Sequence, residues 1–113
     1  MTPTGQTADG SWEIGVRRTI PGVGLDEAWR LGLEIVEGDP ATGAARSRTD
    51  GKVARFHYRP PDWDHDSTLQ LRVLPAARGT TIALHHEGLH DAAARERMRE
   101  RWTAALEKVR SRG

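Results

Sequence analysis

The string His86-Glu87-Gly88-Leu89-His90 is the part of this 113-residue chain whose residue types most resemble a catalytic motif. It matches the H-E-x-x-H pattern, in which two histidines bind zinc and the glutamate acts as general base. That chemistry needs a helix, because only a helix directs the imidazoles of residues i and i+4 to one metal. Here the string follows an alternating apolar run and contains glycine, and an extended chain would hold the two histidines roughly 13 Å apart. We therefore predict a strand end and a loop, with no metal site.

Two histidines and a tyrosine are the other acid-base candidates. His85 and His86 are adjacent on the expected strand, so their side chains point to opposite faces. His86 continues the inward set of Ile82 and Leu84, which favours a hydrogen-bonded structural histidine over a ligand contact. A small enzyme that uses His86 or Tyr58 as acid or base in a groove is the alternative interpretation.

An acidic loop spans residues 62–66, with sequence DWDHD. Carboxylates suit hard metal ions, but the longer spacing and the distal glutamate of a calcium loop are missing. The chain also lacks a glycine-rich phosphate loop and a nucleophile elbow, and it has no cysteine. We therefore predict no catalytic residue and no cofactor, and we expect the loop to be a solvated hairpin connection in which Trp63 either packs back on the sheet or lies at an interface.

The composition is typical of a soluble domain. Hydrophobic residues make up 36% and charged residues 29% of the chain, with 17 basic against 16 acidic side chains. This balance predicts neither a nucleic-acid nor a membrane partner, and no apolar run is long enough to span a bilayer. We expect a cytoplasmic protein in which residues 1–11 are a flexible leader and residues 12–112 form one domain.

Alternating apolar residues predict four strands, at residues 12–20, 53–59, 68–74 and 80–86. A further short edge strand is expected at residues 44–49. The short connections between the later strands indicate an antiparallel meander. A first helix is expected over residues 26–33, with Leu25, Trp29 and Leu33 in one apolar stripe. A long helix is expected over residues 90–112, and its apolar stripe consists of Ala94, Met98, Trp102, Leu106 and Val109.

This order of elements predicts an α+β fold. The sheet has to bury its apolar face, and the last helix has the only apolar stripe of matching length. We therefore expect a curved antiparallel β-sheet wrapped around a long C-terminal α-helix. A space left between them would be the ligand site. The predicted lining, for which plain core packing is the favoured interpretation, consists of Trp29, Phe56, Tyr58, Leu71, Val73, Leu84, His86, Met98 and Trp102.

Several segments are similar, in the same order, to segments of a known family. Residues 80–109 contain a last strand that ends in His-Glu-x-Leu and leads into a helix with Met98, Trp102 and Leu106. WEIGVRRTIPG followed by DEAW looks like a first strand and helix, and RPPDW followed by STLQLRVLP looks like a middle hairpin. In these features the chain resembles the START-like (SRPBCC) helix-grip superfamily. The branch that it resembles most contains proteins related to the activator of the heat-shock-protein-90 ATPase.

The resemblance implies a non-catalytic domain that binds a hydrophobic small molecule, or a partner or client protein, in or near the groove between sheet and helix. The superfamily includes lipid, hormone and polyketide binders, some cyclases and co-chaperone domains. Its members usually carry a second short helix and an extra strand where this chain has only residues 34–52. We therefore expect a groove that is reduced, open or covered by a second subunit. A homodimer or a dimerising module without a ligand is the further alternative.

Overall fold

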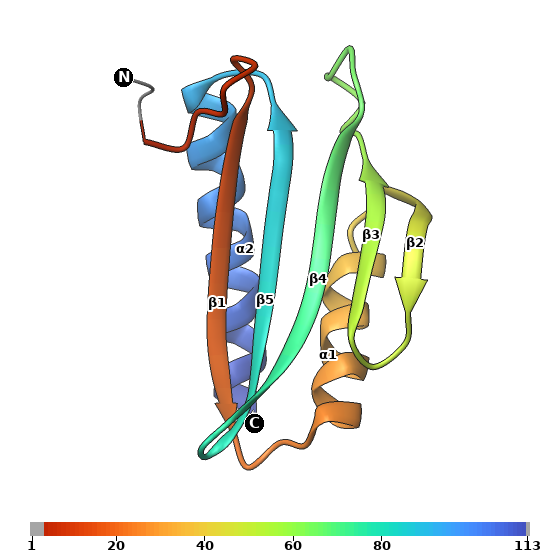
Figure 1. Ribbon diagram of the computed structural model, residues 1–113, viewed down its shortest axis with the longest axis vertical. Helices are drawn as coiled ribbons and strands as arrows, with labels where there is room; N and C mark the ends of the chain where they lie inside the picture. The colour runs from red at the N-terminus through yellow and green to blue at the C-terminus, as the bar shows by residue number, and fades with distance from the viewer. Residues whose placement is uncertain (1–3, 113) are drawn as a thin grey trace.

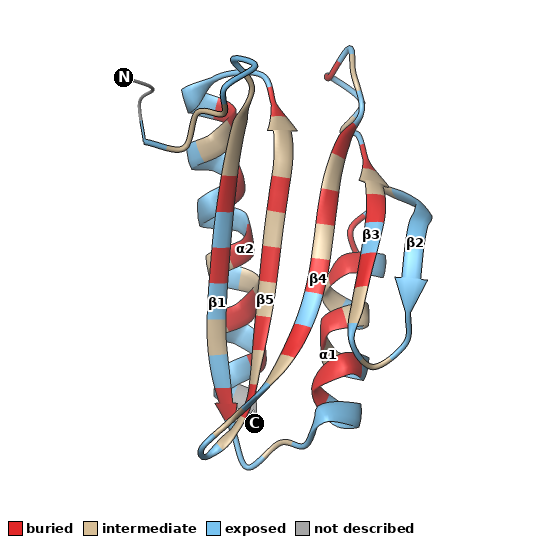
Figure 2. Cartoon of the chain, in the orientation of Figure 1, coloured by how far each residue is buried: buried red, intermediate tan, exposed pale blue. Residues whose placement is uncertain are grey.

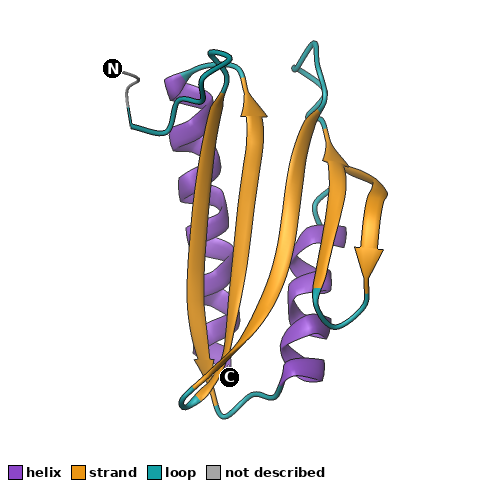
Figure 3. Cartoon of the chain, in the orientation of Figure 1, coloured by secondary structure: helices purple, strands orange, loops and turns teal. Residues whose placement is uncertain are grey.

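The computed structural model describes the backbone of residues 4–112 and the side chains of residues 4–111. Over this range the strands and helices follow one another in the order β-α-β-β-β-β-α (Figures 1 and 3). They are β1 (Trp12–Pro21), α1 (Leu25–Glu37), β2 (Thr42–Thr49), β3 (Val53–Tyr58), β4 (Ser67–Ala76), β5 (Gly79–Leu89) and α2 (Ala92–Arg112). Each strand and helix predicted from the periodicity is present, with ends that differ by a few residues.

The strands form one antiparallel sheet in the order β1-β5-β4-β3-β2. Its register aligns inward-facing apolar residues across the sheet: Val16 pairs with Leu84, Leu84 with Leu71, and Leu71 with Ala54. All four are buried (Figure 2). The alternation of apolar and polar residues therefore indicated correctly which face of each strand is covered.

Both helices cover the same face of the sheet (Figure 1). The long helix α2 packs against β1 and β5, while α1 packs against β4 and β5. This arrangement confirms the predicted α+β class, with a curved antiparallel sheet and a long C-terminal helix. It also shows that α1 shares the inner face of the sheet with α2. No helix in the described part of the chain is long and apolar enough to cross a membrane.

The long helix begins two residues later than the periodicity indicated. Asp91 precedes it, and its Oδ1 accepts a hydrogen bond from the backbone N–H of Ala94 at 2.7 Å. An aspartate in this position satisfies one of the unpaired donors of the first turn, as an N-cap does. The predicted apolar stripe is confirmed as buried along its whole length: Ala94, Met98, Trp102, Leu106 and Val109.

The first helix differs more from its prediction, because it extends to Glu37 instead of ending near Leu33. The predicted stripe was wrong at its start, since Leu25 lies at the first residue of the helix and is 42% exposed. Leu33 is only half-buried. The side that faces the sheet is instead formed by Ala28, Trp29, Gly32 and Val36.

The helix α1 continues past Gly32 because this glycine lies where the helix packs closely on the sheet. A Cβ atom built on Gly32 would lie 2.6 Å from Leu71 Cδ1 on β4. The missing side chain therefore lets α1 approach the sheet closely. Close packing compensates for the cost of glycine inside a helix.

The two ends of the sheet differ in how they are covered. Among the described residues, β2 pairs only with β3, and none of its residues is buried (Figure 2). The homodimer suggested by such an edge stays a prediction. At the start of the chain, residues 1–3 of the predicted leader lie outside the described residues. Within residues 4–11, Gln6 forms a bridge with Trp12, and Gly5 O accepts a hydrogen bond from the N–H of Glu13 at 2.7 Å.

Candidate ligand-binding groove

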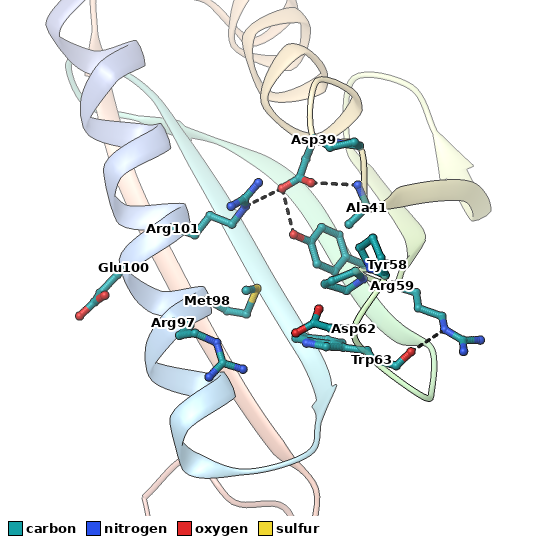
Figure 4. A pocket seen from close by; sticks show the side chains of 13 residues that line it. Asp39, Ala41, Tyr58, Arg59, Asp62, Trp63, Arg97, Met98, Glu100 and Arg101 are labelled. Carbon is teal, nitrogen blue, oxygen red and sulfur yellow. Dashed lines mark hydrogen bonds and ion pairs between the residues drawn. The ribbon is translucent and has the colours of Figure 1, made fainter.

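A hollow of about 680 Å³ opens between α2, the residues that follow α1, and the loop that follows β3. Figure 4 shows it from close by, with Met98 on α2 facing Tyr58 and Trp63 across the opening. Pro60, Pro61 and Ala41 add further apolar lining. The rim is polar, and its charged residues are Asp39, Arg59, Asp62, Arg97, Glu100 and Arg101. The hollow is called the groove from here on.

The loop 59–66 supplies one wall of the groove. Two prolines follow β3, and proline has no N–H with which to continue the strand pairing. The chain then turns, and Trp63 donates its backbone N–H to Pro60 O at 3.0 Å. The Trp63 ring lies edge-on to Tyr58 with ring centroids 6.2 Å apart, and the residue is only 5% exposed. Of the two positions that the sequence left open for Trp63, the structure therefore shows the one packed back on the sheet.

The polar end of the groove is organised around the carboxylate of Asp39, which follows the last turn of α1. Its Oδ2 accepts hydrogen bonds from the Tyr58 hydroxyl at 2.9 Å and from Arg101 Nε at 2.6 Å. Its Oδ1 accepts the backbone N–H of Ala41 at 3.0 Å (Figure 4). The Asp39 side chain is 5% exposed, whereas that of Arg101 is 50% exposed. One buried carboxylate thus joins the end of α1 to β3 and to the middle of α2.

These contacts shift the pKa values of both buried partners. Burial by itself would raise the pKa of Asp39, but the hydrogen bonds from Arg101, the Ala41 N–H and Tyr58 outweigh it and lower the pKa. Burial raises the pKa of the Tyr58 hydroxyl, and the hydrogen bond to the Asp39 carboxylate raises it further. At neutral pH the pair therefore consists of a carboxylate and a protonated phenol.

His86 lies beneath the groove and is fully buried. Trp102 Nε1, which can only donate, lies 3.1 Å from His86 Nδ1. Nδ1 is therefore the acceptor, so the proton of the neutral ring is on Nε2 and is donated to Ser67 Oγ at 2.8 Å. Ser67 in turn donates to Tyr58 O at 2.6 Å. Both ring nitrogens of His86 are thus occupied by other protein groups.

Burial lowers the pKa of His86 to about 3, and the neighbouring His85 lowers it in the same direction, while Asp39 opposes the shift. The side chain is therefore neutral at physiological pH. This environment confirms the structural histidine predicted from the sequence, because the ring is buried and fully hydrogen-bonded.

Comparison with known proteins identifies the fold. No protein-family model matches the chain, and no curated protein matches it in sequence. Among solved structures, protein CV1439 from Chromobacterium violaceum superposes with a TM-score of 0.68 at 14% identity, over 88% of this chain and 95% of that chain. The AHSA1-like protein from Rhizobium etli superposes with a TM-score of 0.61 at 17% identity, over 90% and 82% of the two chains. The di-domain ARO/CYC StfQ from the steffimycin biosynthetic pathway gives 0.54 at 11% identity, over 84% of this chain and 47% of StfQ.

The chain has the helix-grip fold. In this helix-grip domain the residues predicted to line a ligand site fall into three groups. Tyr58 and Met98 line the groove. Trp102 borders a second hollow of about 490 Å³ between α1 and α2. The other six are packed inside the domain, each at most 7% exposed: Trp29, Phe56, Leu71, Val73, Leu84 and His86. Their role in ligand binding stays a prediction.

Sequence reasoning missed most of the polar residues of the groove. Asp39 stands between Gly38 and Pro40, where the sequence indicates a turn and nothing more. Its partner Arg101 is 62 positions away in sequence, and no local pattern links the two. Arg97 is one of many charged residues of the long helix, and its spacing alone does not distinguish it from the others. The DWDHD string gave a local signal, because its tryptophan was expected either to pack back on the sheet or to lie at an interface.

The zinc-like string lies where the sequence indicated. Its first four residues end β5, and α2 begins at Ala92. Gly88 has φ of +79°, a conformation that other residues rarely adopt. His86 is buried while His90 is exposed, so the two imidazoles do not share a face. The interpretation of this string as a strand-to-helix connection is confirmed.

Proposed function

We propose that this helix-grip domain binds a small hydrophobic molecule in the groove and does not catalyse a reaction on it. The observation that carries the proposal is the groove itself. Its volume of about 680 Å³ falls within the range typical of small-molecule sites, roughly 300–1,000 Å³. Its floor is apolar and aromatic, and its charged residues stand around the rim. An apolar molecule would therefore meet apolar surface inside and polar groups at the opening, as in a ligand pocket.

The residues of the groove favour a molecule that carries at least one oxygen acceptor. Tyr58, Trp63 and Met98 offer ring edges and a thioether, which pack well against a planar apolar ligand. Arg101 uses Nε for Asp39, and its terminal nitrogens make no hydrogen bond with the described residues. Arg97 on the same side of α2 adds a second donor at the rim. An oxygen group of the ligand would therefore lie near these two arginines.

Two features support binding without catalysis. The His86 ring has no free lone pair, because Trp102 donates to one nitrogen and the other carries the proton given to Ser67. Tyr58 has a raised pKa and donates to Asp39, so it is a poor acid and a poor base at neutral pH. StfQ, which has a similar fold, comes from the steffimycin biosynthetic pathway. This similarity supports a small molecule as the occupant of the groove. A partner or client protein at the groove is the alternative.

The first prediction tests the groove by filling it. Ala41 lines the groove, whereas Ala104 is exposed on α2 outside it. In Ala41→Trp we expect the new ring to occupy the space of a ligand and to weaken binding of the fluorescent probe anilinonaphthalene sulfonate by about tenfold or more, a loss of about 1.4 kcal/mol. Ala104→Trp is the matched control and should bind the probe like the unmodified protein. Fluorescence titration measures both.

A second readout uses whatever the cell supplies. Native mass spectrometry of freshly purified protein should show a bound small molecule that Ala41→Trp loses and Ala104→Trp keeps. Equal probe affinity in the two variants, or a co-purified molecule that remains bound to Ala41→Trp, would exclude the groove as the binding site.

A further inference from the structure

We propose that Glu13, His85 and Glu87 form a binding site for a divalent cation of the zinc class on the outer face of the sheet. The site is separate from the groove, which lies on the inner side, and does not depend on the function proposed for it. The three residues each offer one ligand atom, and these atoms all lie within 4.8 Å of one another. They come from the start of β1 and the end of β5, which lie side by side at one end of the sheet (Figure 1).

Strand geometry explains why these three side chains meet. Ile14 pairs with His86, and both are buried on the inner face. Their chain neighbours Glu13, His85 and Glu87 therefore point outward, because successive side chains of a strand alternate. A register shift between Trp12 and Ile14 lies beside Glu13. Bulges of this kind bend a strand and change the direction of a side chain, often next to functional sites.

The two carboxylates of this position have few basic partners. Glu13 and Glu87 lie on neighbouring strands with carboxylate oxygens within 4.8 Å of each other, and like charges brought this close on a sheet are destabilising. Among the described side chains, only His85 comes within ion-pair range of the Glu13 carboxylate, with Nε2 3.6 Å from Oε2. Arg95 Nε donates to the main-chain O of Glu13 at 2.8 Å, outside ion-pair range of the carboxylate. No basic side chain of residues 4–111 lies within that range of Glu87.

Elsewhere the same outer face pairs favourably across strands. Arg55 Nε donates to Gln70 Oε1 at 2.9 Å, and the hydroxyls of Thr19 and Thr81 are 2.8 Å apart. The two facing carboxylates are thus an exception on this surface. A divalent ion between them would turn the repulsion into attraction and would link β1 to β5.

The donor set indicates the class of ion. An imidazole nitrogen with two carboxylate oxygens suits zinc and its neighbours in the first transition row better than magnesium or calcium, which favour oxygen ligands alone. Three protein ligands leave a fourth position for water. Across from His85 stands Gly15, which has no side chain to cover the imidazole.

These residues differ from those that the zinc-like string singles out. The string pairs His86 with His90, which the structure separates, whereas the proposed site uses His85 and Glu87, two positions apart on one face of β5. The sequence by itself predicts no metal site anywhere in the chain, and the site proposed here departs from that prediction. The third ligand, Glu13, is far from the other two in sequence, so only the pairing of β1 with β5 brings it into place.

Zinc titration of the chelator-treated protein by isothermal calorimetry tests the proposal. We expect one zinc ion per chain, and we expect His85→Gln and Glu87→Gln each to weaken its affinity by about tenfold or more. His57→Gln and His90→Gln are the controls, because they remove other surface imidazoles and should leave the affinity unchanged. Magnesium should give no comparable heat.

Thermal unfolding provides a second measurement that does not depend on the heat of binding. Zinc should raise the Tm of the unmodified protein and not that of Glu87→Gln. Without zinc, Glu87→Gln should melt at a higher temperature than the unmodified protein, because one of the two facing charges is gone. The proposal is overturned if zinc binds His85→Gln/Glu87→Gln as tightly as the unmodified chain, if His90→Gln abolishes binding, or if millimolar zinc gives neither heat nor a Tm shift.

Discussion

His86 is a titratable residue in the middle of an apolar core, surrounded by aromatic rings. The Tyr58 ring stands edge-on to it with centroids 4.7 Å apart, and the Trp102 ring lies at 6.0 Å. Its two nitrogens are satisfied only while the ring is neutral, because a protonated ring could not accept from Trp102. The residue therefore supports the core at neutral pH and opposes folding in acid.

The second prediction is an acid dependence of stability due to His86. The unfolded chain binds a proton near the ordinary pKa of 6.5, whereas in the folded protein the pKa of His86 is about 3. Between these values the unfolded state binds more protons, so the free energy of unfolding falls as the pH falls, by about 1.4 kcal/mol for each pH unit. Above the unfolded pKa this contribution does not change with pH.

Urea unfolding at a series of pH values from neutral to acid measures the effect. His86→Gln keeps an acceptor for Trp102 and a donor for Ser67 but does not titrate, so its stability should depend less steeply on pH over this range. His57→Gln serves as the control, because His57 lies on the outer face and is only half-buried. Equal slopes for the unmodified protein and His86→Gln would show that this histidine does not oppose folding in acid.

At the scale of elements, α1 shows how a glycine can act as a packing residue. Helix propensity alone disfavours Gly32, and the apolar pattern around it was misread as a stripe that starts at Leu25. The structure shows a helix that extends past the glycine and presses that position against Leu71 of β4. The close approach places Trp29 and Val36 against the sheet, and so it completes the core between α1 and β4.

The third prediction concerns Gly32→Ala. The substitution gains up to about 1 kcal/mol of helix propensity, but its methyl group would lie 2.6 Å from Leu71 Cδ1. Overpacking of this kind costs about 1–3 kcal/mol, so we expect a net loss of stability in urea unfolding. In a Leu71→Ala background the space is open, and the same change should become neutral or stabilising. An identical effect in both backgrounds would contradict the packing role of Gly32.

At the scale of the whole molecule, Asp39 connects parts of the domain that otherwise touch little. It follows α1, accepts the hydroxyl of β3 Tyr58, and pairs with Arg101 in the middle of α2. It also borders both the groove and the hollow between the helices, as does Arg101. The ion pair therefore stands between the two hollows.

The fourth prediction concerns this connection. Asp39→Asn removes the charge that Arg101 binds, and hydrogen bonds to charged groups contribute about 1.5–3 kcal/mol. We expect a loss of about that size in urea unfolding, together with faster hydrogen exchange at the end of α1 and in the middle of α2. Asp62→Asn is the control, because Asp62 is an exposed residue of the same groove and its removal should change stability by less than about 0.5 kcal/mol. Equal stability of the two variants would contradict the connecting role of Asp39.

What could be predicted from the sequence follows from local rules. The period of two in the strands and the spacing of Ala94, Met98, Trp102 and Leu106 are imposed by the need to bury one face of each element, so they revealed the elements, the α+β class and the resemblance to the helix-grip proteins. The strand-to-helix connection after His86 could be predicted because the alternating run before it and the glycine within it do not fit the helix that a zinc-binding H-E-x-x-H motif requires.

Other features were decided only by the tertiary structure. Asp39 is a turn residue in the sequence, and it becomes the centre of the groove only when Tyr58 and Arg101 come together around it. Glu13 joins His85 only because β1 pairs with β5, and Gly32 is a packing residue only because α1 lies on Leu71. Each of these depends on contacts between distant segments. The sequence pattern determines which face of a strand or helix is buried. The way the elements pack together determines which polar side chains come into contact.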